Sequence, residues 1–211
     1  MRTQTKETRD KLTPQMALDL LREGNHRFQN NIKAHRDLLE QVNITADGQY
    51  PFAAILSCID SRTSAELIFD QGLGDIFSIR IAGNVLNEDI LGSMEFACKL
   101  AGSKLIVVMG HSACGAVRGA CEGARLGHLS GLLSKIQPSI EAVKESGDAA
   151  GDEFIHRVAE DNVARVVEEI RSRSDVIDDM IAKGEVGIVG AMYSVTSGAI
   201  EFQEMHCGVP A

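Results

Sequence analysis

Short apolar runs alternate with stretches of helical periodicity along most of this 211-residue chain. Four runs are dense enough in apolar residues to predict buried strands, and they lie at residues 52–57, 76–81, 104–109 and 186–193. Apolar positions at helical spacing predict the helices between them, at residues 64–69, 90–101 and 113–123 and over a long part of residues 129–181. This alternation favours an α/β fold with a mostly parallel central sheet and helices on both of its faces.

The first 45 residues carry helical patterns but no chemical motif. Thr13 followed by Pro14 is typical of a helix start, because a hydroxyl caps the first turn and proline fits its first position. Apolar residues then recur at helical spacing to about Asn30, and a second short helix is expected at residues 37–42. We expect residues 1–45 to form a helical arm that packs on the core or on a partner subunit.

A turn and a second strand are expected after the last of these apolar runs. Residues 197–198 are typical of a turn, and residues 199–202 predict a strand that runs back beside residues 186–193, so we expect an antiparallel hairpin at the C-terminal edge of the sheet. Residues 141–152 are rich in serine, glycine, alanine and acidic side chains, which predicts a surface loop between two helices. Residues 46–211 would then form the α/β core of a single domain.

Composition narrows the class of protein. The formal net charge is −9, whereas a nucleic-acid partner favours a basic face, so we expect no such partner. No apolar run approaches the roughly 18 residues that a membrane-spanning helix needs. The polar residues 1–15 lack the apolar segment of a secretory signal. We therefore expect a cytoplasmic protein without a membrane partner, and the acidic balance is compatible with a metabolic enzyme.

The chain has five cysteines, an odd number, so thiolates that bind a metal are favoured over a disulfide framework. Two segments rich in reactive side chains each follow a predicted strand. Cys58, Asp60 and Arg62 come after the first strand, and His111 and Cys114 come after the third. Because ligands bind at the carboxyl ends of parallel strands, both segments should face the same edge of the sheet and lie close together.

Two thiolates and one imidazole form a ligand set that suits Zn²⁺. Three protein ligands leave one tetrahedral position for water, which is the arrangement of catalytic zinc sites. Gly115 lets the backbone approach the site closely, and the helix that follows offers its positive N-terminus. The sequence thus predicts a zinc ion held by Cys58, His111 and Cys114.

Asp60 and Arg62 are expected to form an ion pair beside the metal. A carboxylate next to a guanidinium stays ionised and keeps one orientation. Asp60 can then accept a hydrogen bond from zinc-bound hydroxide, or it can turn inward and become the fourth zinc ligand itself. The two roles exclude each other at any moment, which suggests an on/off switch.

Each of these residues has a plainer interpretation when it is taken alone. Cys58 at a strand end can be a buried apolar thiol, since free cysteines are often buried. Asp60 and Arg62 can be a structural ion pair, and such pairs also shift pKa values. The metal site is favoured because the ligands and the ion pair occur together at two strand ends.

Two motifs carry a resemblance to a known family. The segments Cys58-Ile-Asp-Ser-Arg62 and His111-Ser-Ala-Cys-Gly115 are similar to the paired ligand motifs of the β-class carbonic anhydrases. Further matches extend over residues 49–202, whereas the N-terminal helices match only in general character. The resemblance implies a zinc lyase that reversibly hydrates carbon dioxide to bicarbonate and a proton, and it implies a homodimer or a tetramer.

The resemblance also implies roles for single residues. These are the zinc ligands Cys58, His111 and Cys114, the hydroxide-orienting dyad Asp60 and Arg62, and the substrate-pocket residues Gln49, Phe77, Phe96 and Gly115. Gln49 matches a glutamine that reaches an active site across a dimer interface and can hydrogen-bond bicarbonate. A subgroup that stores bicarbonate in an inhibitory pocket has a tryptophan where this chain has Ile55, so this chain is similar to the plant-type subgroup with an open fourth zinc position.

Three places depart from the family pattern. Ile59 replaces a common serine, and Thr63 with Ser64 replaces a common valine–proline pair. Phe96 stands where many members have tyrosine, so one polar pocket contact is lost. None of these residues is a metal ligand.

Other functions stay open on the same residues. Zinc hydroxide attacks carbonyl sulfide and carbon disulfide by similar logic, and the ligand set does not discriminate between these substrates and carbon dioxide. A non-catalytic zinc protein would keep the three ligands, although it needs neither the dyad nor Gly115. A thiol redox protein is disfavoured because the chain has no Cys-x-x-Cys motif.

Overall fold

The computed structural model describes residues 3–147 and 150–209. Its strands are β1 (Ala53–Ser57), β2 (Ile76–Arg80), β3 (Leu105–His111), β4 (Gly187–Tyr193) and β5 (Ile200–Phe202). They form one sheet in the order β2-β1-β3-β4-β5, in which β1 to β4 are parallel and β5 is antiparallel to β4. The predicted α/β fold with a C-terminal edge hairpin is therefore confirmed.

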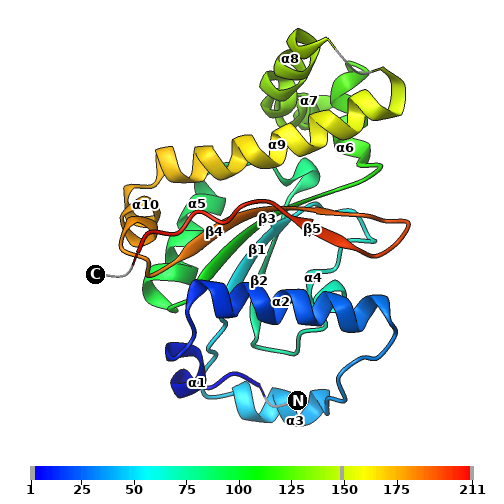
Figure 1. Cartoon of the computed structure of the whole chain (residues 1–211). Helices are drawn as coiled ribbons and strands as arrows, with labels where there is room; N and C mark the ends of the chain where they lie inside the picture. The colour runs from blue at the N-terminus through cyan, green and yellow to red at the C-terminus, as the bar shows by residue number, and fades with distance from the viewer. Residues whose placement is uncertain (1–2, 148–149, 210–211) are drawn as a thin grey trace.

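Helices cover both faces of this sheet. They are α1 (Lys6–Asp10), α2 (Pro14–Gln29), α3 (Leu38–Thr45), α4 (Ala65–Ile68), α5 (Glu88–Glu95), α6 (Gly115–Cys121), α7 (Gly127–Leu133), α8 (Gln137–Ser146), α9 (Gly151–Arg173) and α10 (Asp175–Ala182). Two short 3₁₀ helices, η1 (Ala82–Asn84) and η3 (Ser134–Ile136), and one π-helical turn, η2 (Phe96–Leu100), complete the set. Figure 1 shows α2 on one face and α5, α9 and α10 on the other. Among residues 3–147 and 150–209, no helix is both long enough and apolar enough to cross a membrane.

Burial on two sides explains why the strands are continuous apolar runs. Successive side chains of a strand point to opposite faces. Leu56 and Val108 belong to the core that packs under α9, whereas Ile55 and Val107 belong to the core that packs on α2 and α4. Neither face of β1 or β3 meets water, so these strands lack the polar alternation of a half-exposed sheet.

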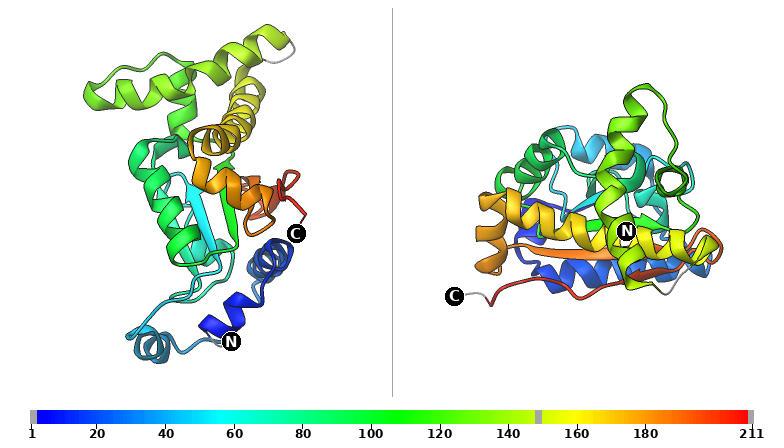
Figure 2. Two further views of the ribbon diagram at one scale, coloured as in Figure 1. Left: turned by 90° about the vertical axis from the view of Figure 1, so that its left-hand side faces the viewer. Right: turned by 90° about the horizontal axis from the view of Figure 1, so that it is seen from above.

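The predicted arm is helical, and Thr13 caps its main helix as expected. The Thr13 side chain accepts a hydrogen bond from the Met16 N–H, and α2 begins at Pro14. α3 also begins where expected, with Asp37 as its cap. α1 is an addition that the sequence pattern did not predict. Figure 2 shows α1 and α3 at one end of the molecule and the α6–α8 segment at the other.

A buried ion-pair cluster ties the arm to the core. The Asp70 carboxylate, only 4% exposed, accepts hydrogen bonds from Arg27 Nε (2.5 Å), Arg36 Nη1 (2.6 Å) and the Ala34 N–H (3.1 Å). Two guanidinium groups thereby compensate a carboxylate that would be costly to bury alone. The cluster fixes the connection between α2 and α3 against the end of α4.

The surface loop predicted at residues 141–152 is wrong over residues 141–146, which belong to α8, and over residues 151–152, where α9 begins. α8 continues to Ser146 because Val143 is buried in the core beneath it, and this apolar contact outweighs the polar local composition. The helix ends at Gly147, whose φ of +75° is the left-handed conformation that favours glycine at a helix end. Residues 148–149 of the predicted loop lie outside the described part of the chain.

Close packing of α2 on the core gives a test of the fold. A Cβ atom added at Gly24 would overlap the carbonyl oxygen of Phe69. We expect Gly24→Ala to lower the free energy of unfolding by about 2 kcal/mol or more in urea denaturation, although alanine is normally the better helix former. Gly131→Ala in α7 is the matched control, since a Cβ there meets nothing within 4 Å. Equal effects of the two changes would contradict the close contact.

Candidate metal centre

Adjacent parallel strands bring three predicted ligands together. Cys58 directly follows β1, His111 is the last residue of β3, and Cys114 immediately precedes α6. Because β1 and β3 pair in parallel, with Ser57 opposite Met109, their carboxyl ends meet at one edge of the sheet. The ligand atoms of the three side chains lie within 4.8 Å of one another, and all three residues are buried.

The geometry of this cluster fits a tetrahedral metal ion. The two sulfur atoms are 4.0 Å apart, close to the roughly 3.8 Å expected for two thiolates bound at about 2.3 Å to one tetrahedral zinc. His111 Nδ1 donates a hydrogen bond to the Ser112 carbonyl (2.9 Å), which leaves Nε2 with its lone pair. Nε2 is buried and has no hydrogen-bond partner within the described residues. A buried lone pair of this kind is suited to a metal.

The thiols of the cluster are electrostatically coupled. The hydrogen bond from Cys114 holds the pKa of the Cys58 thiol well below its ordinary value, and the Gly83 N–H, 3.3 Å from Cys58 Sγ, acts in the same direction. The same sulfur–sulfur hydrogen bond, followed by burial, raises the pKa of Cys114. The site thus favours thiolate at Cys58, the form that binds metals.

Asp60 and Arg62 form the expected ion pair. Arg62 Nε and Nη2 donate to the two carboxylate oxygens at 2.9 and 2.7 Å, and the Arg62 N–H donates to Asp60 Oδ1 at 2.9 Å. These hydrogen bonds from Arg62 hold the pKa of the Asp60 carboxyl well below its usual range. Asp60 is therefore ionised and fixed in orientation. Arg62 Nη2 also reaches the Ala113 carbonyl at 3.5 Å, which links the pair to the second ligand loop.

Gly115 lies next to the cluster, but the single chain does not require a glycine there. It is the first residue of α6, directly after Cys114. A Cβ added at Gly115 would meet nothing within 4 Å, so the space above it is open. The position is accessible to a ligand or to a second chain.

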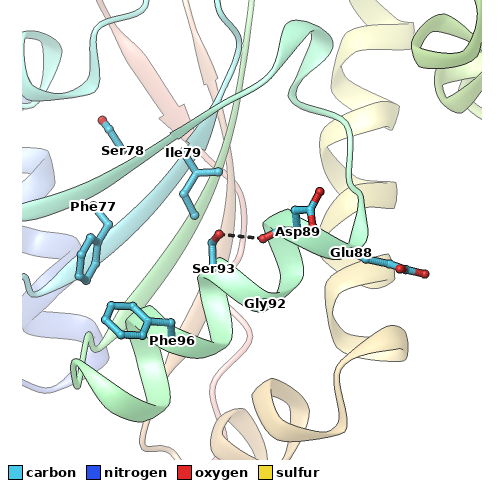
Figure 3. A pocket seen from close by; sticks show the side chains of 8 residues that line it. All are labelled: Phe77, Ser78, Ile79, Glu88, Asp89, Gly92, Ser93 and Phe96. Atoms are coloured by element: carbon cyan, nitrogen blue, oxygen red, sulfur yellow. Dashed lines mark hydrogen bonds between the residues drawn. The ribbon is translucent and has the colours of Figure 1, made fainter. Parts of the chain in front are cut away.

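Phe77 and Phe96 lie together in a hollow between β2 and α5. Their ring centroids are 6.2 Å apart in an edge-on arrangement, and Figure 3 shows the two rings at one end of the hollow, with Asp89 and Glu88 at the other. The hollow has a volume of about 680 Å³. The described residues that line it do not include Cys58, His111 or Cys114, so the single chain keeps these rings apart from the cluster.

Gln49 is also separate from the cluster. It is exposed in the connection between α3 and β1 and lines a hollow with α3, Leu73 and Gly74. Figure 1 places α3 beyond α2, whereas α6, which starts beside the metal ligands, lies on the opposite face of the sheet. The single chain therefore does not bring Gln49 to its own metal site.

Comparison with known proteins identifies the family. A model of the carbonic anhydrase family matches residues 53–200. Carbonic anhydrase 2 of Mycobacterium tuberculosis is 38% identical over 202 residues, which are 92% of this chain and 95% of that protein. The solved β-carbonic anhydrase CcaA has a TM-score of 0.73 and 26% identity, with 89% of this chain and 87% of that chain covered. The chain belongs to the β-carbonic anhydrase family. CafA of Aspergillus fumigatus, another β-carbonic anhydrase, has a TM-score of 0.71 and 26% identity, with 90% of each chain covered.

Two residues that hold the first ligand loop of this β-carbonic anhydrase chain were missed as site residues. Arg80 Nε donates to the Cys58 carbonyl (3.0 Å) and its Nη2 donates to the Asp60 carbonyl (2.6 Å). The buried Thr63 hydroxyl lies 3.0 Å and 2.9 Å from the same two carbonyls. Arg80 ends β2 opposite Ser57, so the rule that sites gather at carboxyl ends of parallel strands could have found it.

The dependence of the Asp60 pKa on Arg62 can be tested in this β-carbonic anhydrase. Without the guanidinium, we expect the pKa of Asp60 in Arg62→Ala to rise toward the ordinary value of about 3.9. Carboxyl ¹³C NMR titration of Asp60 measures this directly. Arg118→Ala is the control, because Arg118 pairs with Asp152 instead. If the pKa of Asp60 stays low in Arg62→Ala, the guanidinium of Arg62 is not the cause of the lowered pKa.

Proposed function

We propose that this chain is a zinc-dependent carbonate dehydratase that interconverts carbon dioxide and bicarbonate. The observation that carries the proposal is the buried group of Cys58, His111 and Cys114. No fourth histidine, cysteine or acidic residue of the described chain joins this group, so one tetrahedral position is left for a small ligand. Membership of the carbonic anhydrase family supports the same chemistry.

The donor set supports zinc as the metal. Two thiolate sulfurs and one imidazole nitrogen suit zinc far better than magnesium or calcium, which prefer oxygen ligands. A zinc ion with three protein ligands supplies Lewis acidity that generates a nucleophile from water near neutral pH. The protein's part is to fix the ligands, and the hydrogen bond from His111 Nδ1 to the Ser112 carbonyl does so for the imidazole.

Asp60 is proposed to orient the attacking water. Its carboxylate is ionised and held by Arg62, so it is placed to accept a hydrogen bond and to aim the water's lone pair at carbon dioxide. To become a metal ligand instead, Asp60 would have to give up its hydrogen bonds from Arg62. The intact pair supports the open state of the site, in which the fourth position is free for water.

We propose that a second copy of the chain completes the substrate pocket. Gln49, Phe77 and Phe96 line hollows that do not include the metal ligands of their own chain, which supports a place for them in the pocket of another copy. The hollow of Phe77 and Phe96 lies beside β2, an edge strand of the sheet, and Phe96 is 49% exposed. An exposed ring beside a strand edge is typical of a surface that meets a partner.

The arm is proposed to dock on that second copy. α3 exposes several apolar side chains, and Leu39 is 72% exposed. Its buried residue Gln41 instead faces the core, where its Oε1 accepts a hydrogen bond from the Leu73 N–H (3.2 Å). Residues 1–45 would thus be the docking arm and residues 46–211 the catalytic core of one domain in a homodimer or tetramer. We place the enzyme in the cytoplasm, where reducing conditions preserve free thiol ligands.

Stopped-flow hydration of carbon dioxide by metal-quantified protein tests the activity. We expect the rate to scale with zinc content and to fall at least 100-fold in Cys58→Ser, which loses a metal ligand. Asp60→Asn should keep the metal and lower kcat by roughly 10- to 100-fold, because a neighbour that orients the reacting group contributes about this much.

Zinc-loaded protein that stays at the buffer rate would contradict the proposed carbon dioxide chemistry. The same samples would then be assayed with carbonyl sulfide and carbon disulfide, which zinc hydroxide attacks by similar logic. A zinc-loaded protein inactive toward all three substrates would favour a non-catalytic metal site.

Assembly through α3 is tested by changing its exposed apolar face. We expect the wild-type chain to exceed its monomer mass of 22.7 kDa in light scattering after size exclusion, and Leu39→Lys to shift toward the monomer mass. Val176→Lys on α10 is the control, since Val176 is an exposed apolar residue outside the arm. A monomeric wild type, or a Leu39→Lys variant with unchanged mass, would contradict this interface.

A further inference from the structure

A run of hydrogen bonds joins α2 to the loop that carries the metal ligands. It starts at Asn25 on the apolar face of α2, passes through the turn between β4 and β5, and ends at Ser112. Ser112 lies between the ligands His111 and Cys114 in the sequence. In Figure 1 the β4–β5 turn lies over the C-terminal end of α2, which brings the two ends of this path together.

The Ser112 end of the path controls the imidazole of His111. The Ser112 carbonyl accepts the hydrogen bond from His111 Nδ1 (2.9 Å), so its position sets both the tautomer and the ring orientation. Ser112 is itself held twice at the end of β4. Its N–H donates to the Tyr193 carbonyl (2.9 Å), and its hydroxyl oxygen accepts from the Val195 N–H (3.0 Å).

The loop after Ser112 needs such support. Ala113 has a φ of +53°, in the left-handed region that an alanine rarely adopts. A residue keeps this conformation only when its surroundings hold it there. The two hydrogen bonds to Ser112 are the contacts that hold the loop from the side of β4.

Asn25 holds the turn between β4 and β5 in place. The turn closes on itself, because the Ser194 carbonyl accepts the Gly198 N–H (2.9 Å). Asn25 Nδ2 donates to the Gly198 carbonyl (2.9 Å), and Asn25 Oδ1 accepts from the Ile200 N–H (3.2 Å). The turn is therefore fixed to α2 on both sides of Ala199.

Asn25 has no spare hydrogen-bonding capacity. Its amide also donates to the Ile68 carbonyl (3.1 Å) and accepts from Gln29 Nε2 (3.2 Å), so both N–H groups and both lone pairs are used. The residue is only 5% exposed. A buried side chain that is satisfied on all sides specifies one geometry for the elements around it.

We propose that Asn25 and Ser112 are positioning residues that set the geometry of the metal ligand His111. Asn25 fixes the β4–β5 turn, the turn fixes Ser112, and the Ser112 carbonyl orients the imidazole. This inference rests on the metal site of the proposed function and adds a residue of the N-terminal arm to its support. Neither residue belongs to the group of three ligands, Cys58, His111 and Cys114.

Metal affinity is the direct readout. In competition with a chromogenic chelator, we expect Ser112→Ala to raise the Kd for zinc about tenfold, as loss of such an outer hydrogen bond commonly does. Asn25→Ala should raise it by less, about threefold, because its effect reaches His111 only through the β4–β5 turn and Ser112. Both variants should also alter the visible absorption bands of the cobalt-substituted protein, which report the geometry of the ligands.

Gln41→Ala separates positioning from general destabilisation. Gln41 is a buried amide of the same arm that bonds the Leu73 N–H and lies outside this path. We expect Gln41→Ala to lower the unfolding temperature without changing the Kd for zinc or the cobalt spectrum. A zinc Kd that changes equally in Gln41→Ala and Asn25→Ala would overturn the proposal.

A double-mutant cycle tests whether Asn25 and Ser112 act through one path. If they do, the Kd of Asn25→Ala/Ser112→Ala rises by less than the product of the two single changes. Fully multiplicative effects, or a wild-type Kd in Asn25→Ala, would overturn the proposal. These binding measurements need no carbon dioxide, so a zinc-binding protein without hydration activity would refute the proposed function while leaving this inference intact.

Discussion

The parallel pairing of β1 with β3 is the constraint on which the rest of the structure depends. Cys58 and His111 are remote in sequence, and only the register of these two strands brings them to one edge of the sheet. The turn after β3 then adds Cys114. Because both faces of the sheet are covered by helices, the cluster is buried, and its sulfur and nitrogen atoms have few alternatives to a metal as partner.

Two neighbouring strands and one ion pair hold the loops that carry the cluster. β2 contributes Arg80, whose guanidinium fixes the carbonyls of the first ligand loop. β4 contributes the hydrogen bonds that hold Ser112, and through it the imidazole of His111. The ion pair of Asp60 and Arg62 lies between the two ligand loops and reaches the carbonyl of Ala113. A metal ion bound here would meet ligands whose geometry is already fixed, which is the arrangement that favours tight and specific binding.

Local pattern predicted the strands and the ligand cluster well. Apolar runs marked β1 to β4, and the rule for carboxyl ends of parallel strands brought Cys58 to His111 and Cys114. Contacts between distant segments were harder to predict. Asn25 interrupts the apolar face of α2, but its partners in the β4–β5 turn follow only from the tertiary arrangement. α8 extended through a polar segment because burial of Val143 overrode local composition.

The residues proposed for the substrate pocket could not be placed from the sequence pattern. Phe77, Phe96 and Gln49 were placed in the substrate pocket by family resemblance alone, and in the single chain they line hollows of their own. Gly115 has open space above it, because a Cβ built there meets nothing within 4 Å.

Zinc K-edge X-ray absorption of the purified protein tests the central claim most directly. Cys58, His111 and Cys114 are proposed to hold one zinc ion and to leave one position for a small oxygen ligand. We expect two sulfur neighbours at about 2.3 Å and two nitrogen or oxygen neighbours at about 2.0–2.2 Å. A shell of four sulfur atoms, or a shell without sulfur, would contradict the account.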